Sequence, residues 1–293
     1  MTRLPTPRHI LPAVALLLFG AVLGVQVDSY LSSDDALQQF EKLKRAFVII
    51  SGRYVEPVDA SQMAEEGVKG MVNSLDPHSS YIPPRQVRDT RDRYEGSFGG
   101  IGIRFEPGDT ARVIAPISGG PSQKVGIMAG DRIMEIEDSS AIGLSGDELQ
   151  NRLKGKIGTT VKVTIYRPLA DKRLTFTIER DEIPLYSVNA TYMLDEKTGY
   201  IEISRFAMST HQEFLNKLDT LRKQGMERLV LDLRDNPGGV MQSAVRIGDE
   251  FLGKGMTIVR TKGRSSEMDT RYRGNDGGAF EQNPVIVLVN RRS

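Results

Sequence analysis

Apolar residues between positions 32 and 95 recur with the period of a helix. Ser32–Asp35, whose side chains can cap a helix, precede the first of two such runs. The second run starts near Asp59 and Ser61 and stops at the prolines that begin with Pro77, because proline interrupts a helix. The apolar members of the two runs are Leu37, Phe40, Leu43, Phe47, Met63, Val68, Met71, Val72 and Leu75. The pattern predicts a small helical unit over residues 32–95.

From residue 96 to residue 183 the period of the apolar residues changes to two, which is typical of strands. Five short alternating segments cover residues 101–105, 111–117, 132–137, 160–167 and 173–180. Pro121 indicates the first turn of one helix. Ser145 with Glu148 has the pattern of a capping box at the start of another helix. A compact β-rich domain with two helices is therefore predicted.

Strand and helix patterns alternate through residues 184–293. Predicted strands over 199–206, 228–233, 256–259 and 285–289 are interspersed with two helical runs, the first of which opens with a capping box from Thr210 to Glu213. This alternation predicts a layered βαβ core. The last strand, Val285–Val289, has five consecutive apolar residues, which indicates burial on both faces. The polar segment Lys262–Asn283 suits either a free loop or an arm that contacts a second subunit of a homo-oligomer.

The N-terminus has the layout of an export signal. Arg3, Arg8 and His9 precede residues 10–25, which are apolar and carry no charge. This stretch is short for a membrane span, yet no clear A-x-A cleavage site follows it, so residues 1–27 suit either a signal peptide or an N-terminal membrane anchor. We expect an exported protein that is periplasmic, or that is held at the inner membrane through residues 10–25 and faces the periplasm.

Composition narrows the chemistry. The 293 residues carry a formal net charge of +1 and no long run of Lys or Arg, so the sequence has no nucleic-acid footprint. The absence of cysteine excludes thiol nucleophiles, disulfides and cysteine-based zinc sites. His9, His78 and His211 do not have the spacing of metal ligands, so we expect no metal and no cofactor. Asp76, His78 and Ser79 are assigned to a turn rather than to a triad, and His211 is expected to be exposed in the first turn of a helix.

The segment GSFGGIGIRF, residues 96–105, is a candidate peptide-binding site. Glycines precede and interrupt a strand that is expected to begin at Ile101. Successive amides of such a segment can converge on a carboxylate, while the strand edge pairs with an extended peptide. A strand with glycine bulges explains the same letters equally well. The candidate peptide-binding residues are Gly99, Gly100, Ile101, Gly102 and Ile103.

The segment LVLDLRDNPGGVM, residues 229–241, is the strongest site signal. A buried strand runs into a turn that contains Gly238 and Gly239, and a helix follows at once. Glycines at the N-terminus of a helix expose amides at the positive end of its dipole, which suits the oxyanion of an acyl transfer. A turn with no chemical role is the alternative. Arg234 and Asp235 are expected to pair structurally rather than to act in catalysis.

Several segments resemble one family when they are taken together. Residues 70–82 have one signature, residues 96–105, 113–138 and 155–167 a second, and residues 199–206 and 229–241 a third. They resemble, in that order, the N-terminal region, the PDZ domain and the core of the carboxyl-terminal processing peptidases, or tail-specific proteases. The resemblance implies a multidomain α+β fold with a helical domain at 32–95, a PDZ domain at 96–183 and a ββα-type, crotonase-like peptidase core at 184–293.

The resemblance also implies an activity. Such peptidases cleave proteins near the C-terminus with a serine nucleophile and a lysine base, which agrees with the lack of a plausible catalytic histidine in this sequence. It assigns Gly99–Ile103 to a groove that captures the C-terminal carboxylate of a protein or peptide substrate. It assigns Gly238 and Gly239 to the turn that supplies one amide of the oxyanion hole, and leaves open which of the two donates.

The resemblance bears on the last residue as well. In the family the final strand leads into a run of small residues whose middle serine is the nucleophile, and Ser293 matches the first hydroxyl of that run. We therefore expect a C-terminally truncated fragment that lacks the nucleophile and the base and hydrolyses nothing. Ser293 as the nucleophile is disfavoured, since no base accompanies it. The alternative is a non-catalytic PDZ adaptor that binds peptides and carries a relic core.

Overall fold

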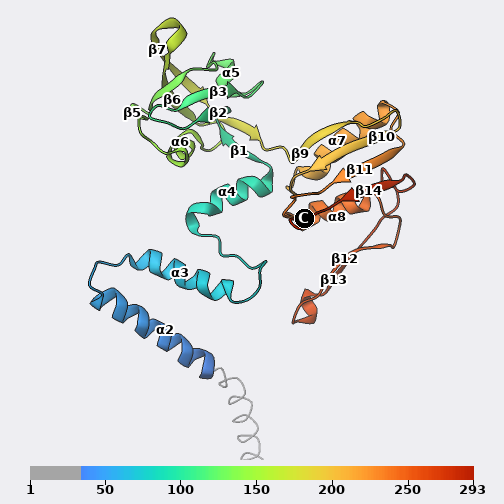
Figure 1. Ribbon diagram of the computed structural model, residues 1–293, viewed down its shortest axis with the longest axis horizontal. Coiled ribbons are helices and arrows are strands. Elements are labelled where there is room, and N and C mark those ends of the chain that lie inside the picture. Colours follow the sequence, from blue (N-terminus) through green and yellow to red (C-terminus); the bar gives the residue numbers. More distant parts are fainter. Residues whose placement is uncertain (1–33) are drawn as a thin grey trace, which may run out of the picture. The chain divides into compact units, whose positions relative to one another are not determined.

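The computed structural model describes residues 34–293 of the chain (Figure 1). The predicted signal or anchor at residues 1–27 lies outside the described residues. Contacts divide the chain into two units, one that ends at Pro83 and one that begins at Pro84. Among the helices of the described part, none combines the length and the apolar character needed to cross a bilayer.

Two helices form the described part of the first unit. Helix α2 covers Asp34–Arg53 and helix α3 covers Ala60–Asn73, so both helical runs of the sequence form helices as predicted. The carboxylate of Asp59 caps α3, because it accepts hydrogen bonds from the amides of Ser61 and Gln62 at 2.8 and 3.1 Å. Helix α3 has no buried residue. The described helices of this unit therefore leave much of their apolar surface open.

Helix α4, Pro84–Glu95, belongs to the second unit. The sequence analysis places these residues in a helical domain that extends to residue 95, but their contacts lie elsewhere. The amide of Gly96 donates to the carbonyl of Asp92 at 2.9 Å, which joins α4 closely to the strand that follows. Asp92 and Asp89 also hold Lys154 of the β-rich module, each at 2.9 Å from Nζ. Charge pairing thus attaches α4 to the β-rich module.

The β-rich module has one main antiparallel sheet and two helices, as predicted. The strands of the main sheet lie in the order β2 (Ile103–Glu106), β3 (Arg112–Pro116), β4 (Arg132–Ile136), β6 (Thr160–Arg167) and β7 (Lys172–Glu179), and β5 (Ser139–Ser140) pairs with β4. Strands β1 (Ser97–Gly100) and β8 (Asp181–Pro184) form a separate pair. The helices are α5 (Pro121–Lys124) and α6 (Gly146–Leu153).

Helix α6 begins with the capping box that the sequence predicts. The amide of Glu148 donates to Ser145 Oγ at 3.3 Å, and the Glu148 carboxylate accepts from the Ser145 amide at 2.9 Å. Leu149 and Leu153 on the same helix are buried against the sheet residues Ile133 and Ile165, which are fully buried. The box fixes where α6 starts, and the two leucines fix which face it turns to the core.

The C-terminal module is a four-stranded sheet with helices packed on it. Its strand order is β14 (Val285–Leu288), β11 (Arg228–Asp232), β10 (Thr198–Ile203) and β9 (Val188–Met193). Strands β10, β11 and β14 are parallel and β9 is antiparallel to β10. Helices α7 (Thr210–Lys223) and α8 (Met241–Asp249) follow β10 and β11. The predicted βαβ alternation is therefore confirmed, with a core that includes Ile201, Phe214, Leu218 and Ile247.

The capping box predicted at Thr210 and Glu213 does not form. The cap position of α7 is Ser209, and Thr210 Oγ1 instead accepts a hydrogen bond from the amide of Ala207 at 2.7 Å. The Glu213 carboxylate accepts from the amide of Ser187 at 2.8 Å, where the chain enters β9. The Ser209 hydroxyl also donates to Glu213 at 2.7 Å. The helix thus starts one residue earlier than a cap at Thr210 requires, which leaves Glu213 one position too far along the helix for the predicted box.

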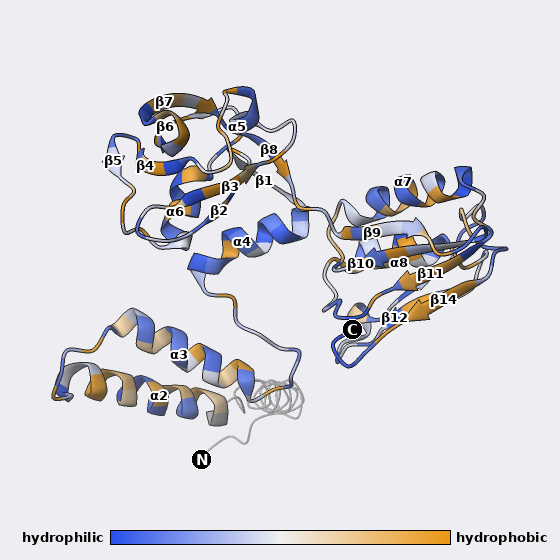
Figure 2. Cartoon of the chain, turned by 45° about the horizontal axis from the view of Figure 1, so that its top comes forward, coloured by the Kyte–Doolittle hydropathy of each residue, from blue (hydrophilic) through white to orange (hydrophobic). Residues whose placement is uncertain are grey.

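The prediction that residues 285–289 are buried on both faces is wrong. In the part of the chain that the structure describes, strand β14 is the edge of its sheet and pairs only with β11. Ile286, Val287 and Val289 are 62%, 47% and 64% exposed, and Figure 2 shows the hydrophobic colour of this strand at the sheet edge. Within the described part of the chain, helix α7 contacts β9 and β10, which come last in the strand order that begins with β14.

The segment 262–283 is more ordered than its polar composition suggests. It contains β13 (Thr270–Arg273), which pairs antiparallel with β12 (Thr257–Thr261) to form a two-stranded arm. The same segment carries Phe280, which is 1% exposed and meets the ring of Phe251 edge-on at 6.1 Å. Of the two alternatives that the sequence leaves open, the free loop does not describe this segment, because β13 pairs with β12 and Phe280 packs in the core. The contact with a second subunit stays a prediction.

Candidate functional site

The glycine-rich segment after α4 forms two short strands rather than one. The sequence analysis starts a strand at Ile101, but β1 ends just before that residue and β2 begins at Ile103. Gly102 has φ +69°, which turns the chain between the two strands. At Gly99 a Cβ atom would lie 2.2 Å from the carbonyl oxygen of Gly155. One glycine therefore permits a turn and the other permits a close approach of two backbones.

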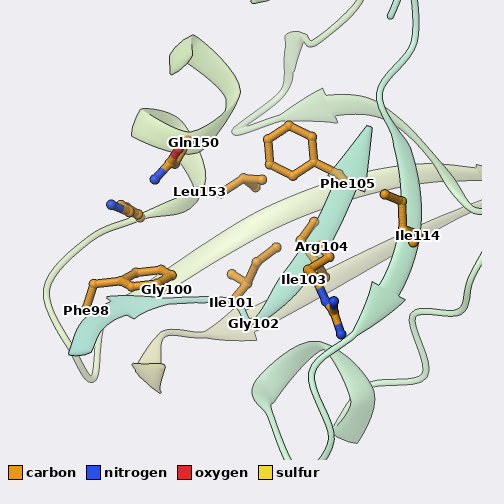
Figure 3. A pocket seen from close by; sticks show the side chains of 11 residues that line it. Phe98, Gly100, Ile101, Gly102, Ile103, Arg104, Phe105, Ile114, Gln150 and Leu153 are labelled. Atoms are coloured by element: carbon orange, nitrogen blue, oxygen red, sulfur yellow. The ribbon is translucent and has the colours of Figure 1, made fainter. Parts of the chain in front are cut away.

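A cavity of about 380 Å³ lies along β2 beside α6 (Figure 3). Figure 3 shows Gln150 and Leu153 on α6 across from Phe105 on β2. The apolar side chains of the lining are Phe98, Ile101, Ile103, Phe105, Ile114 and Leu153. Because β2 is an edge strand of its sheet, its outer backbone groups are open to an added strand. The groove thus combines an apolar wall with a free strand edge.

Backbone amides are presented between β1 and β2. The carbonyls of Ile101 and Gly102 accept hydrogen bonds from the amides of Ser122 and Ile117 at 2.9 and 2.8 Å. Ser122 is fully buried, and its hydroxyl also donates to the Ile101 carbonyl at 2.6 Å. Within the described residues, the amides of Ile101 and Gly102 donate to no acceptor. The carbonyls hold the loop while two amides remain available, which suits the predicted role of Gly99–Ile103 in binding a carboxylate.

The second candidate site is the turn between β11 and α8. Asn236 is buried, and its Nδ2 donates to the Ile203 carbonyl at 2.9 Å while its Oδ1 accepts from the Gly238 amide at 2.8 Å. The Phe206 amide donates to the Gly238 carbonyl at 2.9 Å, and the Val240 amide donates to the Phe206 carbonyl at 2.7 Å. Bonds on both sides therefore hold the turn in one shape against the residues that follow β10.

Gly238 and Gly239 differ in what their amides do. The Gly238 amide is engaged by Asn236, whereas the Gly239 amide donates to no partner in the part of the chain that the structure describes. Gly239 is exposed, with φ +140°, and a Cβ there would lie 2.1 Å from the Phe206 carbonyl oxygen. Gly238 has φ +97° and open space around it. The geometry therefore favours Gly239 over Gly238 as the amide that could meet an oxyanion.

Helix α8 adds positive potential at the Gly239 amide. Its cap position is Val240, directly after Gly239, and no side chain caps this end of the helix. The first amides of a helix have no acceptor within the helix, and they carry the positive end of its dipole. An anion placed at the Gly239 amide would therefore meet additional positive potential from α8.

A charged cluster at the end of β11 supports the turn. Asp232 is buried and accepts hydrogen bonds from Arg234 Nη2 at 2.6 Å, from Arg234 Nε at 3.0 Å and from the Tyr200 hydroxyl at 2.6 Å. The bonds from Arg234 hold the pKa of Asp232 well below its usual range, although burial opposes them. Burial, reinforced by Asp232, raises the pKa of Tyr200 to about 12. Asp232 is therefore a charged acceptor that orders the chain just before the turn.

This cluster is not predicted from the sequence. The expected pair of Arg234 with Asp235 does not form, because Arg234 pairs with Asp232. Asp235 adopts φ +60°, and its amide donates to Asn290 Oδ1 at 3.1 Å. The left-handed backbone at Asp235 separates it from its neighbour. The signal that could have found the cluster is a carboxylate inside the apolar strand LVLDL, because a buried charge needs partners.

Ser293 is held by hydrogen bonds that do not activate it. Its Oγ donates to the Leu233 carbonyl at 2.7 Å and accepts from the Asn290 amide at 2.9 Å. Across residues 34–293, no serine hydroxyl is hydrogen-bonded to a lysine or histidine side chain. The described chain therefore holds no serine with an adjacent base.

The described histidines serve local structure. The Asp76 carboxylate accepts from the amides of His78 and Ser79 at 2.7 and 2.8 Å, which is a turn, as predicted. His211 is not simply exposed, as the sequence analysis expects, because its Nε2 lies 2.8 Å from Glu250 Oε1 and its side chain is 21% exposed. Among residues 34–293 no group of three or more His, Asp or Glu side chains is placed to hold a metal ion.

Three family models match successive parts of the chain. The N-terminal domain of the activating protease CtpB matches residues 24–84, a PDZ domain matches residues 99–179, and peptidase family S41 matches residues 197–293. These matches follow the order of the helical, β-rich and βαβ regions of the structure.

Known proteins are similar to most of the chain. The carboxy-terminal-processing protease of Bartonella bacilliformis is 31% identical over 290 residues, which cover 97% of this chain and 66% of that protein. The carboxy-terminal processing protease CtpA of Bacillus subtilis is 31% identical over 284 residues, covering 95% of this chain and 59% of that protein. A solved structure, the photosystem II D1 C-terminal processing protease, is 23% identical with a TM-score of 0.37, covering 86% of this chain and 68% of that one. The chain thus spans about three fifths of the two relatives' length.

Proposed function

The chain belongs to peptidase family S41, among the carboxy-terminal processing proteases, and on that premise we propose that it is the substrate-binding and oxyanion-binding part of an exported serine endopeptidase. The proposed enzyme recognises protein C-termini through its PDZ domain and cleaves near the tail. The observation that carries the proposal is the exposed Gly239 amide, held at the head of α8 without an acceptor in the described chain.

In the proposed chemistry the C-terminal module stabilises the oxyanion and the β-rich module binds the substrate tail. Attack of a serine oxygen on a peptide carbonyl puts a negative charge on the carbonyl oxygen, and a fixed amide stabilises that charge more than it stabilises the neutral ground state. Gly239 would supply that amide, and Asn236 with Phe206 would hold it in place. The groove beside β2 would retain the substrate tail and raise its effective concentration at the core.

The nucleophile and the base are proposed to come from residues that follow Ser293 in a longer chain. This proposal is supported by the lack of any serine–lysine or serine–histidine pair within residues 34–293. We expect the 293-residue chain to leave peptides intact when their masses are followed by mass spectrometry. Turnover that Ser293→Ala abolishes would refute this expectation.

A non-catalytic peptide-binding protein is the second candidate, and the same lack of a serine with an adjacent base favours it. The two candidates separate when the coding sequence after Ser293 is read. A serine followed by a helix that carries a lysine supports the peptidase, whereas a stop codon directly after Ser293 supports the adaptor. Both candidates keep the groove beside β2 as a binding site.

Binding of C-termini is tested with a matched pair of peptides. A labelled peptide with an apolar last residue and a free carboxylate is expected to bind the 293-residue chain at least tenfold more tightly than its C-terminal amide. The reason is that only the acid can use the free amides of Ile101 and Gly102. Equal dissociation constants for acid and amide would rule out the carboxylate site.

Location and assembly are also proposals. Residues 1–27 support export to the periplasm, with retention at the inner membrane if residues 10–25 are not removed. Fractionation of cells that produce the chain, followed by N-terminal sequencing, distinguishes a cleaved signal from an anchor. The arm formed by β12 and β13 is a candidate contact in a homo-oligomer, which sedimentation of the chain with and without residues 262–272 would test.

A further inference from the structure

Lys154 is a buried lysine in the wall of the peptide groove. It follows the last residue of α6, its side chain is 5% exposed, and it lines the same cavity as Ile101 and Gly102. Lysine is rarely this buried, because the ammonium loses its hydration unless other groups replace it. A buried cation beside free amides is therefore a feature that needs an explanation.

The partners of Lys154 come from a different part of the chain. Its Nζ lies 2.9 Å from Asp89 Oδ1 and 2.9 Å from Asp92 Oδ2, both on α4. Lys154 Nζ also lies over the ring of Phe98, 4.5 Å from the ring centroid. Lys154 thus faces two carboxylates, whose summed charge exceeds its own by one, while Arg104 lines the same cavity from β2. A simple structural pair would need only one carboxylate.

The two aspartates differ in how firmly they are placed. The side chain of Asp92 is 13% exposed, and its backbone carbonyl accepts the Gly96 amide at 2.9 Å. The side chain of Asp89 is 50% exposed and makes no other hydrogen bond in the described chain. Water can therefore solvate Asp89 at once if it leaves Lys154, whereas Asp92 would lose more.

We propose that Lys154 is the cation that binds the terminal carboxylate of the peptide in the groove, and that this carboxylate displaces Asp89. After the exchange Lys154 still contacts two carboxylates, that of Asp92 and that of the peptide. The buried ammonium therefore keeps its charge partners. The free amides of Ile101 and Gly102 line the same cavity and would hold the other oxygen of the carboxylate. The inference rests on the proposed function, because it assumes that the groove binds C-termini.

The exchange predicts opposite effects for the two partners. Lys154→Gln removes the cation, so the free-acid peptide is expected to bind at least tenfold more weakly while its amide changes less than twofold. Asp89→Asn removes the competing charge and keeps the shape of the side chain, so the acid is expected to bind about threefold to tenfold more tightly. Lys162→Gln and Asp138→Asn are the matched controls, since Lys162 and Asp138 form an exposed pair at 2.7 Å that does not line the groove.

The experiment measures dissociation constants of the acid and amide peptides for the 293-residue chain and these four variants, with thermal melting as the check of folding. The expected result is an acid-to-amide ratio that falls in Lys154→Gln, rises in Asp89→Asn and stays constant in both controls. If the unaltered chain prefers the acid but no variant changes the ratio, the inference is overturned and the proposed function stands. If the unaltered chain does not distinguish acid from amide, the groove itself is not a carboxylate site.

Two further outcomes are decisive. Weaker binding of the acid by Asp89→Asn would show that Asp89 orients Lys154 rather than competes for it, and would overturn the displacement. Should Lys154→Gln fail to fold because Asp92 is left without a cation, the Asp89→Asn variant still decides, since it removes no buried group.

Discussion

The groove beside β2 and the turn before α8 both present free backbone amides, but different groups hold these amides in place. Each presents amides without acceptors in the described chain, at Ile101 and Gly102 in one case and at Gly239 in the other. The groove is bounded by a strand edge and by charges from α4, which are groups that can exchange partners. The turn is held by Asn236 and by the backbone of Phe206, which are groups that cannot exchange partners. Under the proposed function, a site that admits many tails needs adjustable groups, whereas a site for one short-lived charge needs fixed ones.

The glycines make the same distinction. Gly99 is close to the Gly155 carbonyl, but its backbone has an ordinary conformation. Gly239 combines a left-handed φ of +140° with a predicted Cβ contact of 2.1 Å to the Phe206 carbonyl oxygen. The first glycine is required by space alone, and the second by both space and backbone conformation. A substitution at each therefore tests how rigid the two sites are.

Gly239→Ala is expected to have the largest effect. A methyl group must displace the Phe206 carbonyl and also adopt a strained φ, so we expect a loss of about 3 kcal/mol in the free energy of opening of the turn. Hydrogen exchange with mass spectrometry on the 293-residue chain measures this loss in peptides that cover residues 228–250. Gly238→Ala is the matched control, where strain without a clash should cost about 1 kcal/mol. Equal losses at both glycines would contradict the assignment of the rigid contact to Gly239.

Gly99→Ala is expected to have a smaller effect, confined to the groove. Its Cβ would also lie 2.2 Å from a carbonyl oxygen, but β1 is a four-residue strand whose one strand partner in the described chain is β8, so we expect it to yield more easily than the turn. We expect a loss of about 2 kcal/mol in local stability and weaker peptide binding, with no change in exchange at residues 228–250. Gly108→Ala, in a loop with room for a methyl group, is the control. Faster exchange in the turn would show that the two sites are not independent.

Local sequence signals predict the capping box of α6 correctly but not that of α7. Ser145 caps α6, and within the described chain the Glu148 carboxylate accepts only from Ser145. Thr210 and Glu213 have the same spacing, but α7 is capped one residue earlier, at Ser209, so the predicted box does not form. Lys154 could not be connected with Asp89 or Asp92 from the sequence, because more than 60 residues separate them. The candidate glycines of both sites can therefore be read from the sequence, but the groups that support them are brought together only by the fold.

The apolar strand 285–289 shows why an apolar run alone does not predict burial. A run of apolar residues indicates burial only if layers cover both faces of the strand. In the described chain β14 pairs on one side with β11, and Ile286 remains 62% exposed. Hydropathy reports what a strand can bury, whereas exposure depends on which other elements are packed against it.

Asp232→Asn is expected to have the smallest effect, and its dependence on pH separates the turn from the groove. The pKa of Asp232 is lowered in the folded chain, mainly by Arg234, so its contribution is complete above the ordinary carboxyl pKa of about 3.9 and is lost as the pH falls below that value. We expect Asp232→Asn to lower the free energy of unfolding by about 1 kcal/mol at pH 7, with a cost that shrinks towards pH 3.

The measurement is urea unfolding of both proteins at pH 7, 5, 4 and 3, with the difference between them plotted against pH. Asp219→Asn is the control, because Asp219 makes an exposed pair with Lys223 at 2.6 Å, and it should cost little at any pH. A difference that grows as the pH falls would have the wrong sign for a lowered pKa and would reject the charged acceptor at the end of β11. Peptide binding in the groove should be unaffected by Asp232→Asn at neutral pH, because the groups that support the turn are not those that line the groove.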